Sequence, residues 1–185
     1  MKELSLNVLD ISQNSISAGA TLVEILLTED ESGWLTLVIA DNGKGMSRAF
    51  VERVTDPFCT TRTTRKVGMG LPLLKLAAEQ ADGELRIESV TQEENPAEHG
   101  TTVTATFRTG SIDCTPLGDM VSTMCVIIQG HPEVDYVFRH TTPELEVTLD
   151  TRELREVLGP EISLAENEVI VWISDYLKQQ YQNES

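Results

Sequence analysis

The segment WLTLVIADNGKGM, at positions 34–46, constrains the fold of this chain more than any other part of its 185 residues. Positions 34–40 are nearly all apolar, which predicts a strand in the centre of a sheet. Asp41 ends that strand, and Gly43 and Gly45 follow it. A carboxylate there can accept a hydrogen bond from an exocyclic amine, and glycines let a flat ring approach the backbone closely. The same residues also suit an ordinary turn, so this segment alone leaves a ligand site and a turn equally open.

A second glycine-rich segment, VGMGLP at positions 67–72, leads into a helix that we expect at positions 71–81. Free backbone N–H groups and the positive end of a helix dipole suit a phosphate. The segment is neither a Walker loop nor a dinucleotide fingerprint that follows a strand. Between positions 57 and 78 there is no acidic residue, but there are four cations, Arg62, Arg65, Lys66 and Lys75. This part of the chain therefore indicates an anion site.

The first helix, expected at positions 3–17, carries four polar residues at steps of three and four, so that they share one face: Glu3, Asn7, Asp10 and Asn14. The amide oxygen of Asn14, with Asp10 one turn earlier, can ligate a hard cation. Magnesium takes one or two protein oxygens and draws its other ligands from phosphates and water. A solvated polar face is the ordinary alternative for one Asn and one Asp.

Hydrophobic periodicity predicts the remaining elements. Further strands are expected at positions 21–28, 84–90 and 101–108, and a short helix at 47–54. After position 109 the pattern changes to a helix, a hairpin and two more helices, at positions 119–129, 134–149, 151–158 and 166–181. Thr151 is the expected N-cap of the helix at positions 151–158. We therefore place a boundary near position 110, with domains at positions 1–109 and 110–185.

Composition limits the class of partner and the compartment. A formal charge of -16 disfavours a general nucleic-acid binder, because phosphates would be repelled. No apolar run approaches the ~20 residues that cross a bilayer, and the N-terminus lacks the apolar stretch of a secretory signal. We expect a cytoplasmic protein without a nucleic-acid or membrane partner. Cys59, Cys114 and Cys125 lack disulfide or zinc spacing, and we expect reduced thiols.

In their order along the chain, these segments resemble the gyrase, Hsp90, histidine-kinase and MutL (GHKL) ATPases, which have the Bergerat fold. Positions 10–21 look like the MutL form of the N box, positions 41–46 like the G1 box, positions 56–61 like the F box of histidine kinases, positions 68–71 like the G2 box, and Gly100-Thr101 with Val103 like the last box. The resemblance covers positions 3–108. It implies an α+β fold, a two-layer α/β sandwich with helices on one face of a mixed sheet, and leaves positions 110–185 as a small C-terminal α/β appendage.

The resemblance also implies ATP and Mg²⁺ as cofactors. Asp41 would bind the adenine amine with Thr101 at the same ring edge, and Asn14 would hold Mg²⁺ against the phosphates. Other nucleotide contacts would come from the glycine-rich boxes, namely Gly43, Gly45, Met46, Gly68, Met69, Gly70 and Leu71. The lid would comprise Phe58 and positions 60–66, with Arg62, Arg65 and Lys66 as candidate phosphate contacts.

Asp10 stands where many family members have the glutamate that activates water or an acceptor. Aspartate is shorter by one methylene, which argues against efficient hydrolysis because a base must reach its proton at hydrogen-bond distance. Three functions stay open. The protein can be a regulatory ATP-binding switch in signal transduction that acts on a protein partner. It can be a stand-alone protein kinase, similar to anti-sigma kinases, that phosphorylates Ser, Thr or His of a partner in trans with Asp10 as base. It can also be a slow ATPase.

Two departures from the family narrow these functions. No acceptor histidine precedes position 3, and His99, His131 and His140 fall in or after the last box, so we expect no self-phosphorylation. The segment after position 109 is too short for the transducer domain of MutL and gyrase, which disfavours DNA repair. The apolar residues of the last helix can form a homodimer interface, or they can pack onto the helix's own domain. These residues are Val169, Ile170, Trp172, Ile173, Tyr176 and Leu177.

Overall fold

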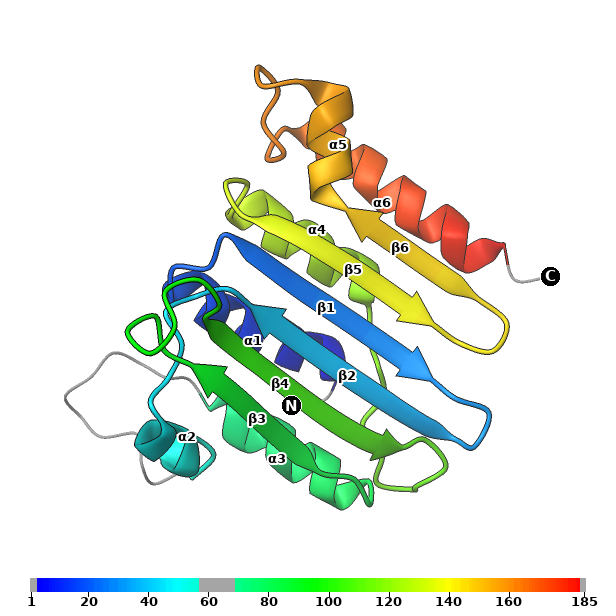
Figure 1. The fold of residues 1–185 in the computed structure, drawn as a ribbon. Helices are drawn as coiled ribbons and strands as arrows, with labels where there is room; N and C mark the ends of the chain where they lie inside the picture. The colour runs from blue at the N-terminus through cyan, green and yellow to red at the C-terminus, as the bar shows by residue number, and fades with distance from the viewer. Residues whose placement is uncertain (1–2, 57–68, 184–185) are drawn as a thin grey trace.

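A six-stranded sheet runs across the computed structural model, which describes residues 3–56 and 69–183 (Figure 1). The strand order is β3-β4-β2-β1-β5-β6. The strands are β1 (Leu22–Glu29), β2 (Trp34–Asp41), β3 (Leu85–Val90), β4 (Gly100–Arg108), β5 (Asp135–Thr141) and β6 (Glu146–Asp150). Neighbouring strands are antiparallel except β1 and β5, which are parallel. The sheet is therefore mixed, as predicted, and β2 lies near its centre.

Helices form the second layer. They are α1 (Leu4–Ser17), α2 (Arg48–Val54), α3 (Gly70–Gln80), α4 (Met120–Gly130), α5 (Thr151–Leu158) and α6 (Asn167–Gln182). In Figure 1, α1, α3, α4 and α6 lie behind the sheet, whereas α5 continues from the end of β6. No helix in the described ranges is both long enough and apolar enough to span a membrane.

Burial along the strands alternates with a period of two, as expected for a sheet with one covered face. On β2, Leu35, Leu37 and Ile39 are at most 4% exposed, and the residues between them are only partly buried. The covered side of the sheet carries the core, and the predicted α+β fold with helices on one face is confirmed.

The C-terminal part of the chain extends this sheet. β5 pairs with β1 from Leu22↔Asp135 to Thr28↔Thr141, and β6 pairs with β5. In α6, Val169, Ile173 and Leu177 pack into the core, being at most 7% exposed. Trp172 and Tyr176 lie on the surface of α6, where their rings stack with centroids 4.9 Å apart. The division near residue 110 stays a prediction, and the sheet is continuous across it.

The expected N-cap of α5 is wrong by one residue. Asp150 is the N-cap, and its side chain accepts the backbone N–H of Arg152. Thr151 is fully buried, and its hydroxyl accepts the N–H of Tyr136 and donates to Asp135. The hydroxyl is drawn to the sheet because the strand-to-helix junction buries Thr151 against β5.

The described cysteines, Cys114 and Cys125, are free thiols, and burial raises the pKa of both. A thiol with a raised pKa forms little of the reactive thiolate near neutral pH, which suits the expected structural role. Cys59 lies outside the described residues.

Candidate functional site

A row of polar side chains crosses the sheet at the end of β2. Asp41 is paired with Thr101 on β4, and Thr101 is paired with Ser89 on β3. Directly opposed residues point to the same face of a sheet, and this row continues the helix-covered face formed by Ile39 and Val103. Asp41 and Thr101, for which the family resemblance implies contacts at one ring edge, thus lie side by side.

The carboxylate of Asp41 is oriented by its own chain. The Ser15 hydroxyl, on α1, donates to one Asp41 oxygen at 2.6 Å, and the Gly43 N–H donates to the other at 2.9 Å. The Ser15 oxygen also lies 3.3 Å from the Ile11 carbonyl oxygen. Each carboxylate oxygen retains lone pairs for a further donor. The arrangement presents a fixed acceptor at the junction of α1 and the sheet.

Hydrogen bonds attach the turn that follows Asp41 to the loop after α1. The Asn42 side chain accepts the N–H groups of Thr21 and Leu22 and donates to the Thr21 hydroxyl. The Lys44 N–H donates to the Ala18 carbonyl at 2.9 Å. The turn is therefore tied to the loop at several points.

Further hydrogen bonds attach the same turn to β3 and to the loop that follows β3. The Met46 N–H donates to the Ser89 hydroxyl at 2.7 Å, and the Gln92 N–H donates to the Lys44 carbonyl at 2.9 Å. Gly45 has φ +72°, and a Cβ there would overlap the carbonyl of Val90. Only glycine combines this backbone conformation with so close an approach.

The N-terminus of α3 meets α1 at Asp10. A Cβ on Gly70 would lie 3.2 Å from the Asp10 Cβ and 3.9 Å from its carboxylate oxygen Oδ2, so glycine permits the approach. The N-cap of α3, Met69, makes no side-chain capping bond, and the first turn contains no acid. Asn14 lies one turn beyond Asp10 on α1 and is partly exposed. The start of α3, whose N-cap side chain makes no capping bond, thus lies against Asp10, one turn before Asn14 on α1.

The side chains of Asn14 and Asp10 suit a magnesium ion that is also coordinated by the phosphates of a nucleotide. Asn14 and Asp10 supply hard oxygens, and Mg²⁺ is commonly held by one or two protein oxygens plus substrate phosphates. Across residues 3–56 and 69–183, no group of three or more His, Cys, Asp or Glu side chains is arranged to hold a metal by itself. The residues therefore fit a nucleotide-borne cation better than a metal site built from protein alone.

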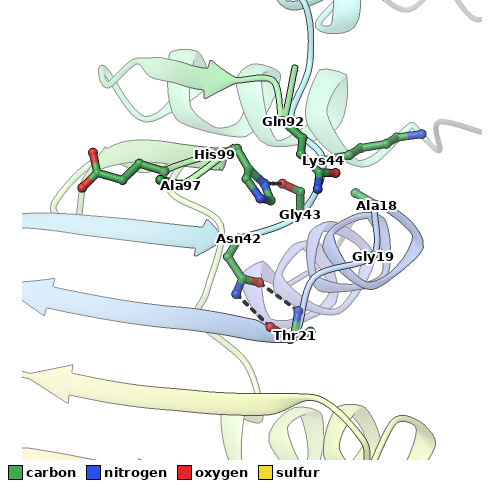
Figure 2. A pocket seen from close by; sticks show the side chains of 10 residues that line it. Ala18, Gly19, Thr21, Asn42, Gly43, Lys44, Gln92, Ala97 and His99 are labelled. Atoms are coloured by element: carbon green, nitrogen blue, oxygen red, sulfur yellow. Dashed lines mark hydrogen bonds between the residues drawn. The ribbon is translucent and has the colours of Figure 1, made fainter. Parts of the chain in front are cut away.

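A pocket of about 590 Å³ opens beside the turn that follows Asp41 (Figure 2). It is lined by Ala18, Gly19, Thr21, Asn42, Gly43, Lys44, Gln92, Ala97, Glu98 and His99. The His99 ring contacts the Gly43 carbonyl through Nδ1, as Figure 2 shows. Of the predicted nucleotide contacts within residues 3–56 and 69–183, only Gly43 lines this pocket.

Some predicted contacts are placed differently or lie outside the described residues. Met69 is exposed, Leu71 is buried in the core, and Met46 packs against the core. The predicted contacts that lie outside the described residues are Phe58, Arg62, Arg65, Lys66 and Gly68.

Three polar residues of this region had no role assigned from the sequence: Ser15, Ser89 and His99. Ser15 lies next to Asn14 and faces the sheet, because helix residues at that spacing point in different directions. Ser89 and His99 reach the site only through the register of β3 with β4, which a sequence does not specify without knowledge of the connecting loop.

Comparison with known proteins identifies relatives of this chain. The profile described as histidine kinase-, DNA gyrase B-, and HSP90-like ATPase matches residues 1–111. A protein of Shewanella frigidimarina described as a sensor is 33% identical over 85 residues, which cover 44% of this chain and 13% of that relative. The chain therefore spans a small part of that relative's length.

Two solved structures share the fold. The N-terminal domain of a DNA repair protein has a TM-score of 0.55 and 17% identity, covering 86% of this chain and 58% of that chain. The Aquifex aeolicus MutL ATPase domain complexed with ADP has a TM-score of 0.54 and 15% identity, covering 85% of this chain and 69% of that chain. At these identities the likeness concerns the fold alone.

Proposed function

The chain belongs to the family of histidine kinase-, DNA gyrase B- and HSP90-like ATPases, and we propose that it is a cytoplasmic Mg-ATP-binding switch that acts on a protein partner. The observation that carries this proposal is the Asp41 carboxylate, fixed by Ser15 and Gly43 and paired with Thr101 at the end of the sheet. The fold relative from Aquifex aeolicus is described as a complex with ADP, which supports a nucleotide ligand here.

In this proposal, Asp41 accepts a hydrogen bond from the exocyclic amine of adenine. An ionised carboxylate is an acceptor only, so it pairs with an amine and not with a carbonyl oxygen. Guanine has a carbonyl at the corresponding ring position, which would leave two acceptors facing each other. A site built to hydrogen-bond one such group rejects the analogue that lacks it. ATP is therefore preferred to GTP.

The phosphates would lie where the start of α3 meets α1. Backbone N–H groups at an uncapped helix start attract anions, and Gly70 lets that start approach Asp10. Asn14 would hold Mg²⁺, which supplies neutralising charge to the phosphates when bound. Phe58, Arg62, Arg65 and Lys66 stay candidate nucleotide contacts from the family resemblance and lie outside the described residues.

A second candidate function is phosphoryl transfer to a partner. Asp10 is exposed at the surface of α1, where the hydroxyl or imidazole of another protein can reach it. An exposed carboxylate at this position supports a protein kinase acting in trans, with Asp10 as the base. Its short side chain favours the switch over a slow ATPase, because a base must lie within hydrogen-bond distance of the proton that it removes.

Calorimetric titration with ATP, with and without Mg²⁺, tests the proposal, and phosphate release is followed in the same samples. We expect the wild type to bind more tightly with Mg²⁺, the variant Asn14→Ala to lose that gain, and neither to release phosphate. Gln13→Ala, on the same helix, is the matched control and should bind as the wild type does. Steady turnover without a partner would favour the ATPase function, and absence of binding by the wild type would overturn the proposal.

A further inference from the structure

Ser89 contacts three polar groups at the end of the sheet. Its hydroxyl oxygen lies 2.7 Å from the Met46 nitrogen, 3.0 Å from the Gly100 carbonyl oxygen and 2.8 Å from the Thr101 hydroxyl oxygen. The side chain is partly buried on the edge strand β3, in the same row as Thr101 and Asp41. None of these three partners is Asp41, so any effect of Ser89 on a ligand at Asp41 passes through its neighbours.

The hydrogens of these groups can be counted. A serine hydroxyl donates one hydrogen bond and accepts two. The Met46 N–H can only donate, and the Gly100 carbonyl can only accept. If Ser89 donates to Gly100, the Thr101 hydroxyl must donate to Ser89 for their 2.8 Å contact to be a hydrogen bond. In that arrangement each of the three contacts of the Ser89 oxygen is a hydrogen bond with one donated proton.

The other arrangement is less favourable. If Ser89 donates to Thr101, its oxygen and the Gly100 carbonyl oxygen lie 3.0 Å apart with no proton between them. Two oxygens at that distance repel each other when neither donates. The first arrangement is therefore preferred, and it directs the Thr101 proton toward Ser89 and away from the ligand side.

We propose that Ser89 is a positioning residue that determines base specificity, because it accepts the hydrogen bond of the Thr101 hydroxyl and leaves the Thr101 oxygen as an acceptor beside Asp41. The inference rests on the proposed nucleotide site. Two adjacent acceptors suit a base with an exocyclic amine and disfavour one with a carbonyl oxygen in its place. Without Ser89, the Thr101 hydroxyl is free to rotate and to donate toward that carbonyl.

Calorimetric titrations with ATP and with inosine triphosphate test this inference, because inosine triphosphate has a carbonyl where ATP has the amine. We expect Ser89→Ala to reduce the ratio of ATP affinity to inosine triphosphate affinity by about tenfold, as one neutral hydrogen bond can supply. Ser89→Thr keeps a hydroxyl and should retain the wild-type ratio. If Ser89 has a purely structural role, Ser89→Ala weakens the binding of both nucleotides equally and leaves the affinity ratio unchanged. That result would overturn the inference.

A second test measures the effect of Ser89→Ala in a protein that already carries Thr101→Val. In Thr101→Val the hydroxyl that Ser89 controls is absent, so adding Ser89→Ala should leave the affinity ratio of Thr101→Val unchanged. A further change in the ratio in that background would show that Ser89 acts by another route and would overturn the inference. Thr106→Val, which removes a hydroxyl from the same strand away from this row, is the control and should keep the wild-type ratio.

The wild-type titration separates the two proposals. If the wild type binds ATP and Ser89→Ala keeps its discrimination, only the role of Ser89 fails. If the wild type binds neither nucleotide, the proposed function fails and the Ser89 inference fails with it.

Discussion

Asp41 receives two hydrogen bonds from its own chain, from the Ser15 hydroxyl and the Gly43 N–H. Both donors fix the orientation of the carboxylate. The donors come from different elements, α1 and the turn after β2. The carboxylate is thus aligned before a ligand arrives, which lowers the ordering cost of binding.

The substitution Asp41→Asn should abolish measurable ATP binding. The amide nitrogen cannot accept a hydrogen bond, so two donors face each other wherever it replaces the oxygen that accepts the Gly43 N–H or the adenine amine, and each mismatch costs ~1–3 kcal/mol. Calorimetry with Mg-ATP checks this, with Asp175→Asn on the exposed side of α6 as the matched control. Undiminished binding by Asp41→Asn would remove Asp41 from the base site.

Gly45→Ala should destabilise the protein by roughly 2 kcal/mol or more, because an alanine at φ +72° is strained and its Cβ would overlap the Val90 carbonyl. Gly110→Ala is the matched control, since a Cβ there meets nothing within 4 Å. Urea unfolding of both variants makes the comparison. Equal midpoints for the two variants would show that the turn does not need glycine.

At this scale the sequence indicated the residues that we propose to carry the chemistry but not the residues that position them. Asp41, Thr101, Asp10 and Asn14 follow from residue type and order along the chain. Ser89 depends on strand register, which is set by pairing across a loop, so no local pattern reveals it.

The edge strand β6 is covered by a side chain from α6. The Gln180 amide accepts the Thr148 N–H at 2.9 Å and donates to the Thr148 carbonyl at 2.9 Å. It thereby imitates the backbone of a further strand. Exposed strand edges invite pairing with another chain, and a covering group blocks this.

Gln180→Ala should lower the free energy of unfolding by about 1–2 kcal/mol, because two hydrogen bonds to β6 are lost. Gln179→Ala, at an exposed neighbouring position on α6, should have little effect. Urea unfolding measures both, and light scattering at high concentration reports whether the uncovered edge promotes association. Identical unfolding of the two variants would contradict a stabilising role for Gln180.

The helices and strands agree with the periodicity of the sequence to within a residue or two, because their apolar faces repeat regularly. The bounds of α5 agree as well, and only its N-cap differs from the prediction. Asp150 and Thr151 are both good capping residues, and only burial against Asp135 and Tyr136 decides that Thr151 turns inward.

Across the whole molecule, the C-terminal segment is joined to the N-terminal part by strand pairing and by a buried polar link. His140 on β5 lies 2.8 Å from a Glu29 carboxylate oxygen and 2.9 Å from the Tyr181 hydroxyl oxygen. The parallel pairing of β1 with β5 joins segments about a hundred residues apart, and such long-range contacts leave no local pattern in the sequence.

The protein should lose stability as pH rises above about 10, the ordinary pKa of tyrosine. Burial raises the pKa of Tyr136 and of Tyr181 above that value, and the nearby carboxylates Glu133 and Glu29 raise them further. The folded state therefore keeps these two protons at a pH where the unfolded chain releases them. The linkage of these two tyrosines therefore leaves stability unchanged below pH ~10 and lowers it above that pH.

Urea midpoints measured from pH 8 to pH 11 check this dependence. Tyr136→Phe and Tyr181→Phe should each have a smaller loss above pH ~10 than the wild type, because each removes one linked proton. The same loss in both variants and the wild type would show that other groups cause the alkaline transition.

The most direct test of this account is a crystal structure with Mg²⁺ and a non-hydrolysable ATP analogue. The account predicts the adenine amine within hydrogen-bond distance of the Asp41 carboxylate, with the phosphates between Asn14 and the start of α3. A nucleotide bound in the pocket lined by Thr21, Lys44 and His99, with Asp41 uncontacted, would contradict it.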